Sequence, residues 1–167
     1  MYLLEAAYLR IIGSAAFQAL IGVDVGMDDV STDPWYGGWV FQGLSDENAP
    51  YRQPEGSGMA AVVVSSRGGW ASPNQTNTAH FPLLSVFIFG DCSRDANGNL
   101  SQRDAEVRVR RVADVIDPLF HDPANRTHVW GTFPIVSCLR HSELNLQDVP
   151  SGDGVVRGEL TYEIVID

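Results

Sequence analysis

The sequence predicts an α+β fold in which a mostly antiparallel β-sheet carries two helices packed on one face. Two observations lead to this prediction. Runs of β-branched and aromatic residues bounded by Gly and Pro are typical of strands, and they lie on both sides of an amphipathic segment at 103–120. A second helical pattern opens the chain at 2–20. The expected order is therefore α–β–β–β–α–β–β within a single domain, 1–167.

The first twenty residues are apolar enough to suggest a signal or membrane segment. Glu5 and Arg10 interrupt the apolar run, and Gly13–Ser14 divides it. Apolar residues recur about every four positions along 2–20, which is typical of a helix with a wide buried face. We therefore expect a buried N-terminal helix and no membrane segment.

The expected strands are separated by loops rich in Gly, Pro and Asn. Residues 44–58 and 67–78 are polar and are expected to be loop insertions. A turn at 149–153 makes the last two strands an antiparallel hairpin. The strands are expected at about 39–41, 59–66, 79–90, 130–148 and 154–167.

The last two strands show alternating patterns that predict which residues share a face. In the first of them the alternating positions are Ile135, Ser137, Leu139 and His141. In the tail, one face carries Leu160, Tyr162, Ile164 and Ile166.

The segment 103–120 carries the clearest helical pattern of the chain. Ser101 followed by Asp104 approximates a capping box, and Pro118 is expected to kink or end the helix. The loop 91–102 in front of it contains Asn97-Gly98, a strong turn signal. The apolar stripe of the helix consists of Ala105, Val109, Val112, Ile116 and Leu119.

Composition limits the classes of function. The net charge of -10 argues against a free surface that grips nucleic acid through phosphate neutralisation, although it is compatible with an acidic ring through which DNA slides. All 11 basic residues are arginines, and arginine suits interfaces because its planar fork pairs with carboxylates. Two cysteines are too few for a disulfide framework.

The sequence contains no motif for catalysis or cofactor binding. It lacks the Walker A pattern, the dinucleotide-binding glycine pattern and the G-x-S-x-G elbow, and the absence of lysine excludes a P-loop. The four histidines match no standard zinc spacing. We therefore expect no catalytic residue, no cofactor, no metal site and no enzyme activity.

Charged and aromatic residues are instead candidates for contacts with other subunits. Asp114 and Asp117 are spaced for salt bridges with Arg110 and Arg111 along the helix, and the same side chains could pair across a subunit boundary. Two loop tryptophans are compatible with either interface anchors or core residues. The candidate interface residues are Arg103, Arg108, Arg110, Arg111, Asp114, Trp35 and Trp70.

Four segments together resemble the tail terminator proteins of long-tailed bacteriophages and the related tail-completion and head–tail joining proteins. The expected insertions at 44–58 and 67–78 exceed the compact pattern of that family. The matching segments are the helix 2–20, the strand PLLSVFIFGD (82–91), the Arg-rich helix 103–120 and the hairpin ending RGELTYEIVID (157–167).

The resemblance implies a tail-terminator-like domain that forms a homohexameric ring at the end of the tail tube. Such a ring ends tube polymerisation and joins the tail to the head-side connector or stopper protein. Its location would be the tail–neck junction of the virion, after assembly in the host cytoplasm, with genomic DNA passing through the lumen without sequence-specific binding. Other head–tail connectors, a tail tube component, and a small enzyme or ligand-binding domain remain alternatives.

Overall fold

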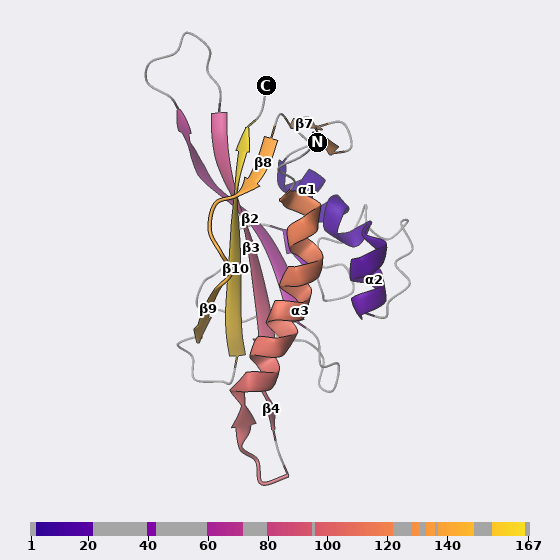
Figure 1. The fold of residues 1–167 in the computed structure, drawn as a ribbon, viewed down its shortest axis with the longest axis vertical. Coiled ribbons are helices and arrows are strands. Elements are labelled where there is room, and N and C mark those ends of the chain that lie inside the picture. The colour runs from indigo at the N-terminus through magenta and orange to yellow at the C-terminus, as the bar shows by residue number, and fades with distance from the viewer. Residues whose placement is uncertain are drawn as a thin grey trace.

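A mixed β-sheet covered by helices on one face forms the body of the protein (Figure 1). β1 runs parallel to β2, whereas the other strand pairs of this sheet are antiparallel. The predicted α+β class, with a mostly antiparallel sheet, is confirmed. Within the described residues its six strands are β1 (Val40–Gln42), β2 (Ala60–Ala71), β3 (His80–Asp91), β10 (Val155–Val165), β8 (Ser137–Arg140) and β9 (Asn145–Asp148), the last two both pairing with β10.

The computed structural model describes most, but not all, of the chain. Trp35 and the expected insertion at 44–58 lie outside the described residues. The prediction of a loop over 67–78 is wrong for residues 67–71, because β2 continues to Ala71, and the rest of that segment lies outside the described residues. The described residues are 3–21, 40–42, 60–71, 80–94, 96–121, 128–130, 133–135, 137–148 and 155–165.

β2 extends further than its sequence suggested because it accommodates a bulge. Its pairing with β3 shifts between Arg67 and Trp70, which face Leu83 and Phe81. Three steps along β2 therefore match two along β3, so one extra residue is inserted at the Gly68–Gly69 pair. The glycines that signalled a loop mark an irregularity inside the strand.

The predicted N-terminal helix is two helices, α1 (Leu3–Ile12) and α2 (Ala15–Ile21). The chain breaks at Gly13–Ser14, where the Ser14 hydroxyl accepts a hydrogen bond of 3.2 Å from the Phe17 N–H and so caps α2. The break changes the buried face, because Ala15 and Ala16 are exposed whereas Phe17 is buried. In the described part of the chain, no helix has the length and hydrophobicity needed to span a membrane.

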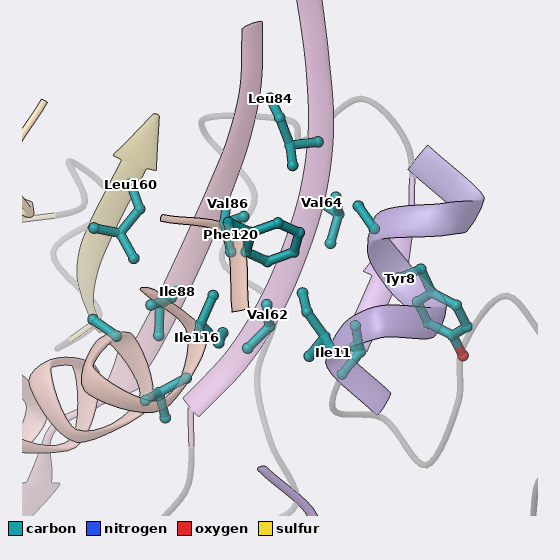
Figure 2. Packing of buried hydrophobic residues seen from close by; sticks show 14 of the residues in the cluster. Tyr8, Ile11, Val62, Val64, Leu84, Val86, Ile88, Ile116, Phe120 and Leu160 are labelled. Atoms are coloured by element: carbon teal, nitrogen blue, oxygen red, sulfur yellow. The ribbon is translucent and has the colours of Figure 1, made fainter. Parts of the chain in front are cut away.

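The main core lies between the sheet and the helices, and α3 (Gln102–Phe120) supplies much of it. The predicted stripe is confirmed, with Leu119 only partly buried, and Ala113 and Phe120 are buried in addition. α1 packs against β1 and β2, and α3 packs against β3 and β10. Figure 2 shows side chains from these elements meeting in one cluster, among them Tyr8, Ile11, Val62, Val64, Leu84, Val86, Ile88, Ile116, Phe120 and Leu160.

Two glycines allow α3 to approach the sheet closely. A Cβ on Gly90 would lie 2.9 Å from both the Ala105 carbonyl oxygen and Val109 Cγ2. A Cβ on Gly158 would lie 2.5 Å from Val109 Cγ1. Val109 therefore places one methyl group over each glycine, and neither position has room for a side chain.

The segment before α3 forms a short hairpin where the sequence predicted a loop. β4 (Ser93–Arg94) pairs with β5 (Leu100–Ser101), and the exposed turn contains Gly98 with a φ of 81°. The turn predicted at Asn97-Gly98 is thus confirmed. The predicted capping box is wrong, because the Ser101 side chain makes no capping hydrogen bond and its residue pairs in β5.

The expected strand 130–148 is divided into short strands. β6 (His128–Trp130) and β7 (Phe133–Ile135) pair with each other, outside the main sheet. β9 and β10 form the predicted hairpin, but β8 pairs with a different part of β10, residues 162–165. The tail alternation is confirmed, since Leu160, Tyr162 and Ile164 are buried. Ile166 lies outside the described residues.

Candidate interface surfaces

The outward side of α3 presents most of the charged residues that the sequence indicated. Arg103, Arg110, Arg111 and Asp114 are exposed, and Arg108 is half-buried. In the part of the chain that the structure describes, no salt bridge joins Asp114 to Arg110 or Arg111. The exposed charges of Arg103, Arg110, Arg111 and Asp114 are therefore accessible to a partner. Trp70 lies in β2, opposite Phe81 of β3.

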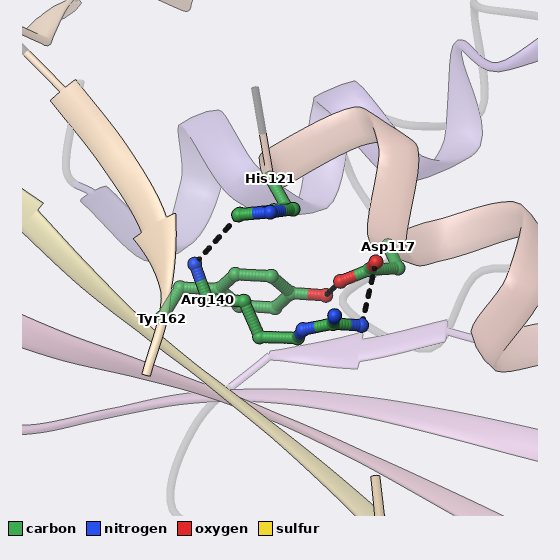
Figure 3. Close-up of polar contacts among 4 residues, drawn as sticks. All are labelled: Asp117, His121, Arg140 and Tyr162. Carbon is green, nitrogen blue, oxygen red and sulfur yellow. Dashed lines mark hydrogen bonds and ion pairs between the residues drawn. The ribbon is translucent and has the colours of Figure 1, made fainter. Parts of the chain in front are cut away.

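Asp117 lies in a polar cluster at the C-terminal end of α3 (Figure 3). Its Oδ2 accepts a hydrogen bond of 3.0 Å from Arg140 Nη1, and its Oδ1 accepts one of 3.0 Å from the Tyr162 hydroxyl. The Arg140 backbone N–H donates to the imidazole Nδ1 of His121 at 3.0 Å. The backbone N–H of His121 in turn donates to the backbone carbonyl oxygen of Asp117 at 2.8 Å. The cluster therefore holds the end of α3 against β8 and β10.

The helical spacing predicted that Asp117 pairs with Arg110 or Arg111, and this pairing is wrong, because Asp117 pairs with Arg140. Its partners Arg140 and Tyr162 lie 23 and 45 residues away, so helical spacing could not reveal them. Arg10 also reaches this end of α3, where its Nε donates to the Leu119 carbonyl oxygen and its guanidinium lies 5.5 Å from the centroid of the Trp130 ring.

The Asp117–Tyr162 hydrogen bond is expected to contribute more to stability than the Asp117–Arg140 salt bridge. The Arg140 and Asp117 side chains are 36% and 21% exposed, and exposed pairs contribute about 0–1 kcal/mol. The Tyr162 residue is completely buried, so Asp117→Ala leaves its hydroxyl without this acceptor. We expect Asp117→Ala to lower the free energy of unfolding by about 1–3 kcal/mol, and by clearly less in a Tyr162→Phe background. Urea unfolding of the four proteins in this double-mutant cycle measures the coupling, and equal costs of Asp117→Ala in both backgrounds would contradict it.

Burial raises the pKa of two groups, Cys138 beside this cluster and Tyr162 within it. It raises the pKa of the Cys138 thiol from its ordinary value of 9.0 to about 12, an effect that Arg10 opposes and Asp117 reinforces. Burial, together with the charge of Asp117 and its hydrogen bond, raises the pKa of Tyr162 far above its ordinary range. Cys138 is therefore a neutral packing residue at physiological pH.

The raised pKa of Cys138 predicts a loss of stability in alkali. Above pH 9.0 the unfolded state releases the thiol proton while the folded state retains it up to about pH 12, so stability falls as the pH rises through this window. Cys138→Ala should make the fall between pH 9 and 12 shallower in thermal unfolding. Val112→Ala, at a buried residue that does not titrate, is the control and should lower stability without changing the slope. Identical slopes for the Cys138 variant and the wild type would refute the assignment.

Within the described residues, no group of three or more His, Cys, Asp or Glu side chains is arranged to hold a metal ion.

The fold of this chain is found in a known virion structure, although its sequence matches no family. No family model matches the sequence, and no curated protein matches it. Among solved structures, the chain is similar to a chain in the virion of a native gene transfer agent particle, with a TM-score of 0.62 and 13% sequence identity. The match covers 98% of this chain and 93% of that chain. The two chains share a fold. At this identity the likeness concerns the arrangement of elements and carries no correspondence between individual residues.

Proposed function

We propose that this chain is a structural protein of a virion, and that it acts as a tail terminator. The observation that carries the proposal is the shared fold with a chain of a gene transfer agent virion along nearly the whole length of both chains. The order of elements supports it, because α1–α2, β3, α3 and the β9–β10 hairpin occupy the four segments that resemble tail terminators.

In this role the protein acts by binding alone. Copies of the chain form a homohexameric ring at the end of the tail tube, one ring face binds the last ring of tube protein, and the other binds the head-side connector or stopper. Each contact within a cyclic ring is heterologous, so one patch of a subunit meets a different patch of its neighbour. The net charge of -10 favours a lumen through which genomic DNA passes without adhering.

The candidate interface residues acquire specific roles under this proposal. Arg103, Arg108, Arg110, Arg111 and Asp114 contact a neighbouring subunit or an adjoining ring, and Trp35 and Trp70 are proposed anchors at such contacts. These side chains come from α3, β2 and the segment before β1.

A tube-length assay tests the function directly. Tail tube protein of the same virion is polymerised with and without the purified chain, and tube lengths and ends are examined by electron microscopy. We expect shorter tubes of uniform length with a ring at one end, and a native mass six times 18.2 kDa for the ring. Incorporation along the tube wall would instead indicate a tube component, and binding only to the head connector would indicate a connector or stopper.

A further inference from the structure

Two large apolar side chains are exposed in the described part of the chain, and they lie on opposite sides of the subunit. Val107 of α3 is 41% exposed and Leu139 of β8 is 43% exposed. α3 covers one face of the sheet (Figure 1). Leu139 is directed to the other face, because its neighbour Cys138 is in the core and Arg140 reaches Asp117 on α3. Ser137 and Leu139 thus lie on the same face, as the predicted alternation requires, and this face is turned away from the core.

Basic side chains surround Val107 on the helix. Arg103, Arg110 and Arg111 lie four residues before it and three and four residues after it, so all three are its neighbours on the surface. These arginines are not placed to stabilise the helix dipole. The dipole favours cations in the last turn of a helix, and α3 has no basic residue there. We call this surface the α3 ridge; it consists of Arg103, Val107, Arg110, Arg111 and Asp114.

An acidic group lies beside Leu139 on the opposite face. In the sheet, Glu163 of β10 stands between Leu139 of β8 and Leu83 of β3, and Val165 follows on the same face. Glu163 is half-buried and makes no ion pair among the described residues. The next position in this row, on β2, is Arg67. We call the surface formed by Leu83, Leu139, Glu163 and Val165 the sheet patch.

We propose that the α3 ridge of one copy of this chain docks on the sheet patch of a second copy. The ridge offers an exposed apolar side chain flanked by exposed arginines, and the patch offers exposed and half-buried apolar side chains around a carboxylate that has no ion pair in the described part of the chain. Two copies that each carry a net charge of -10 repel one another, so association requires local complementarity of this kind.

The geometry of this contact suits a ring. The two surfaces belong to opposite faces of the subunit, so the contact is heterologous and each copy can bind a neighbour on either side. The inference rests on the proposed function in that a terminator must form such a ring, but it is tested separately from tube capping.

Charge exchange in the full-length chain tests the pairing. We expect Arg110→Glu and Glu163→Arg each to weaken self-association at least about tenfold, because each places like charges together. The double variant should return to within about threefold of the wild type, because the pair is restored in reverse. Glu143→Arg, at an exposed glutamate outside both surfaces, is the matched control and should not change association. Sedimentation velocity and native mass spectrometry measure association, and circular dichroism confirms folding.

Cysteine cross-linking tests the contact independently of charge. In a Cys92→Ser background, oxidation of the Val107→Cys, Leu139→Cys double variant should give a ladder of covalent oligomers, whereas each single variant should give none. Dimers from Val107→Cys alone would show a helix-to-helix contact and overturn the proposal.

The outcomes separate this inference from the proposed function. If the wild-type chain caps tubes, but the charge-exchange double variant does not recover association and the double-cysteine variant gives no ladder, the pairing is wrong and the proposed function still holds. A wild-type chain that remains monomeric at all concentrations would also overturn the pairing, and the tube-length assay would then decide the function alone. If the wild-type chain binds DNA, and Arg110→Glu abolishes this binding without changing self-association, the α3 ridge is a nucleic-acid surface and the proposed pairing is wrong.

Discussion

Phe120→Ala is expected to lower the free energy of unfolding by about 3–5 kcal/mol, the range measured for removal of a buried aromatic side chain. Phe120 is 1% exposed at the last position of α3. Its ring packs edge-on against Trp130 and tilted against Tyr162, with both centroids 5.2 Å away. Truncation therefore leaves a cavity lined by two large rings that cannot easily close it.

Urea unfolding of the monomer at low protein concentration measures this effect. Val107→Ala in the same helix is the control, because Val107 is exposed and its truncation should change stability by less than about 0.5 kcal/mol. A loss below about 1 kcal/mol for Phe120→Ala would mean that the rings collapse into the space, and would contradict the packing described above.

Gly158→Ala is expected to destabilise the protein by about 1–3 kcal/mol through overpacking. The new Cβ would meet Val109 Cγ1 at 2.5 Å and Leu144 Cδ1 at 3.0 Å, and both contacts are with side-chain atoms. Val109→Ala removes the closer of them. In that background the additional cost of Gly158→Ala should therefore fall by at least about half, because the two sites are in direct contact.

Gly90→Ala provides the matched comparison. Its Cβ would also meet Val109, but it would lie equally close to the backbone carbonyl oxygen of Ala105, at 2.9 Å. Val109→Ala cannot relieve a clash with the helix backbone, so Gly90→Ala should remain destabilising in both backgrounds. Equal rescue at both glycines in thermal or urea unfolding would show that α3 shifts as a body, contrary to this prediction.

Elements whose sequence patterns are local could be predicted without the structure. The stripe of the 103–120 helix, the apolar run of β3 and the alternation of the C-terminal strand each repeat with the period of one element, and the structure contains all three. The turn at Asn97-Gly98 was equally local, because its conformation depends on one glycine with positive φ.

The partners of the polar residues and the direction of the exposed residues could not be predicted in this way. The partners of Asp117 come from β8 and β10, and no helical spacing connects them. Leu139 faces outward because β8 pairs with the far part of β10 and buries Cys138 instead. The arginines of the α3 ridge could therefore be predicted from the sequence. Glu163, the carboxylate proposed to pair with them, could not, because only the pairing of β8 with β10 places it beside Leu139. The physical reason is that periodicity records which face of an element is apolar, while the neighbours of each face are set by contacts between distant parts of the chain.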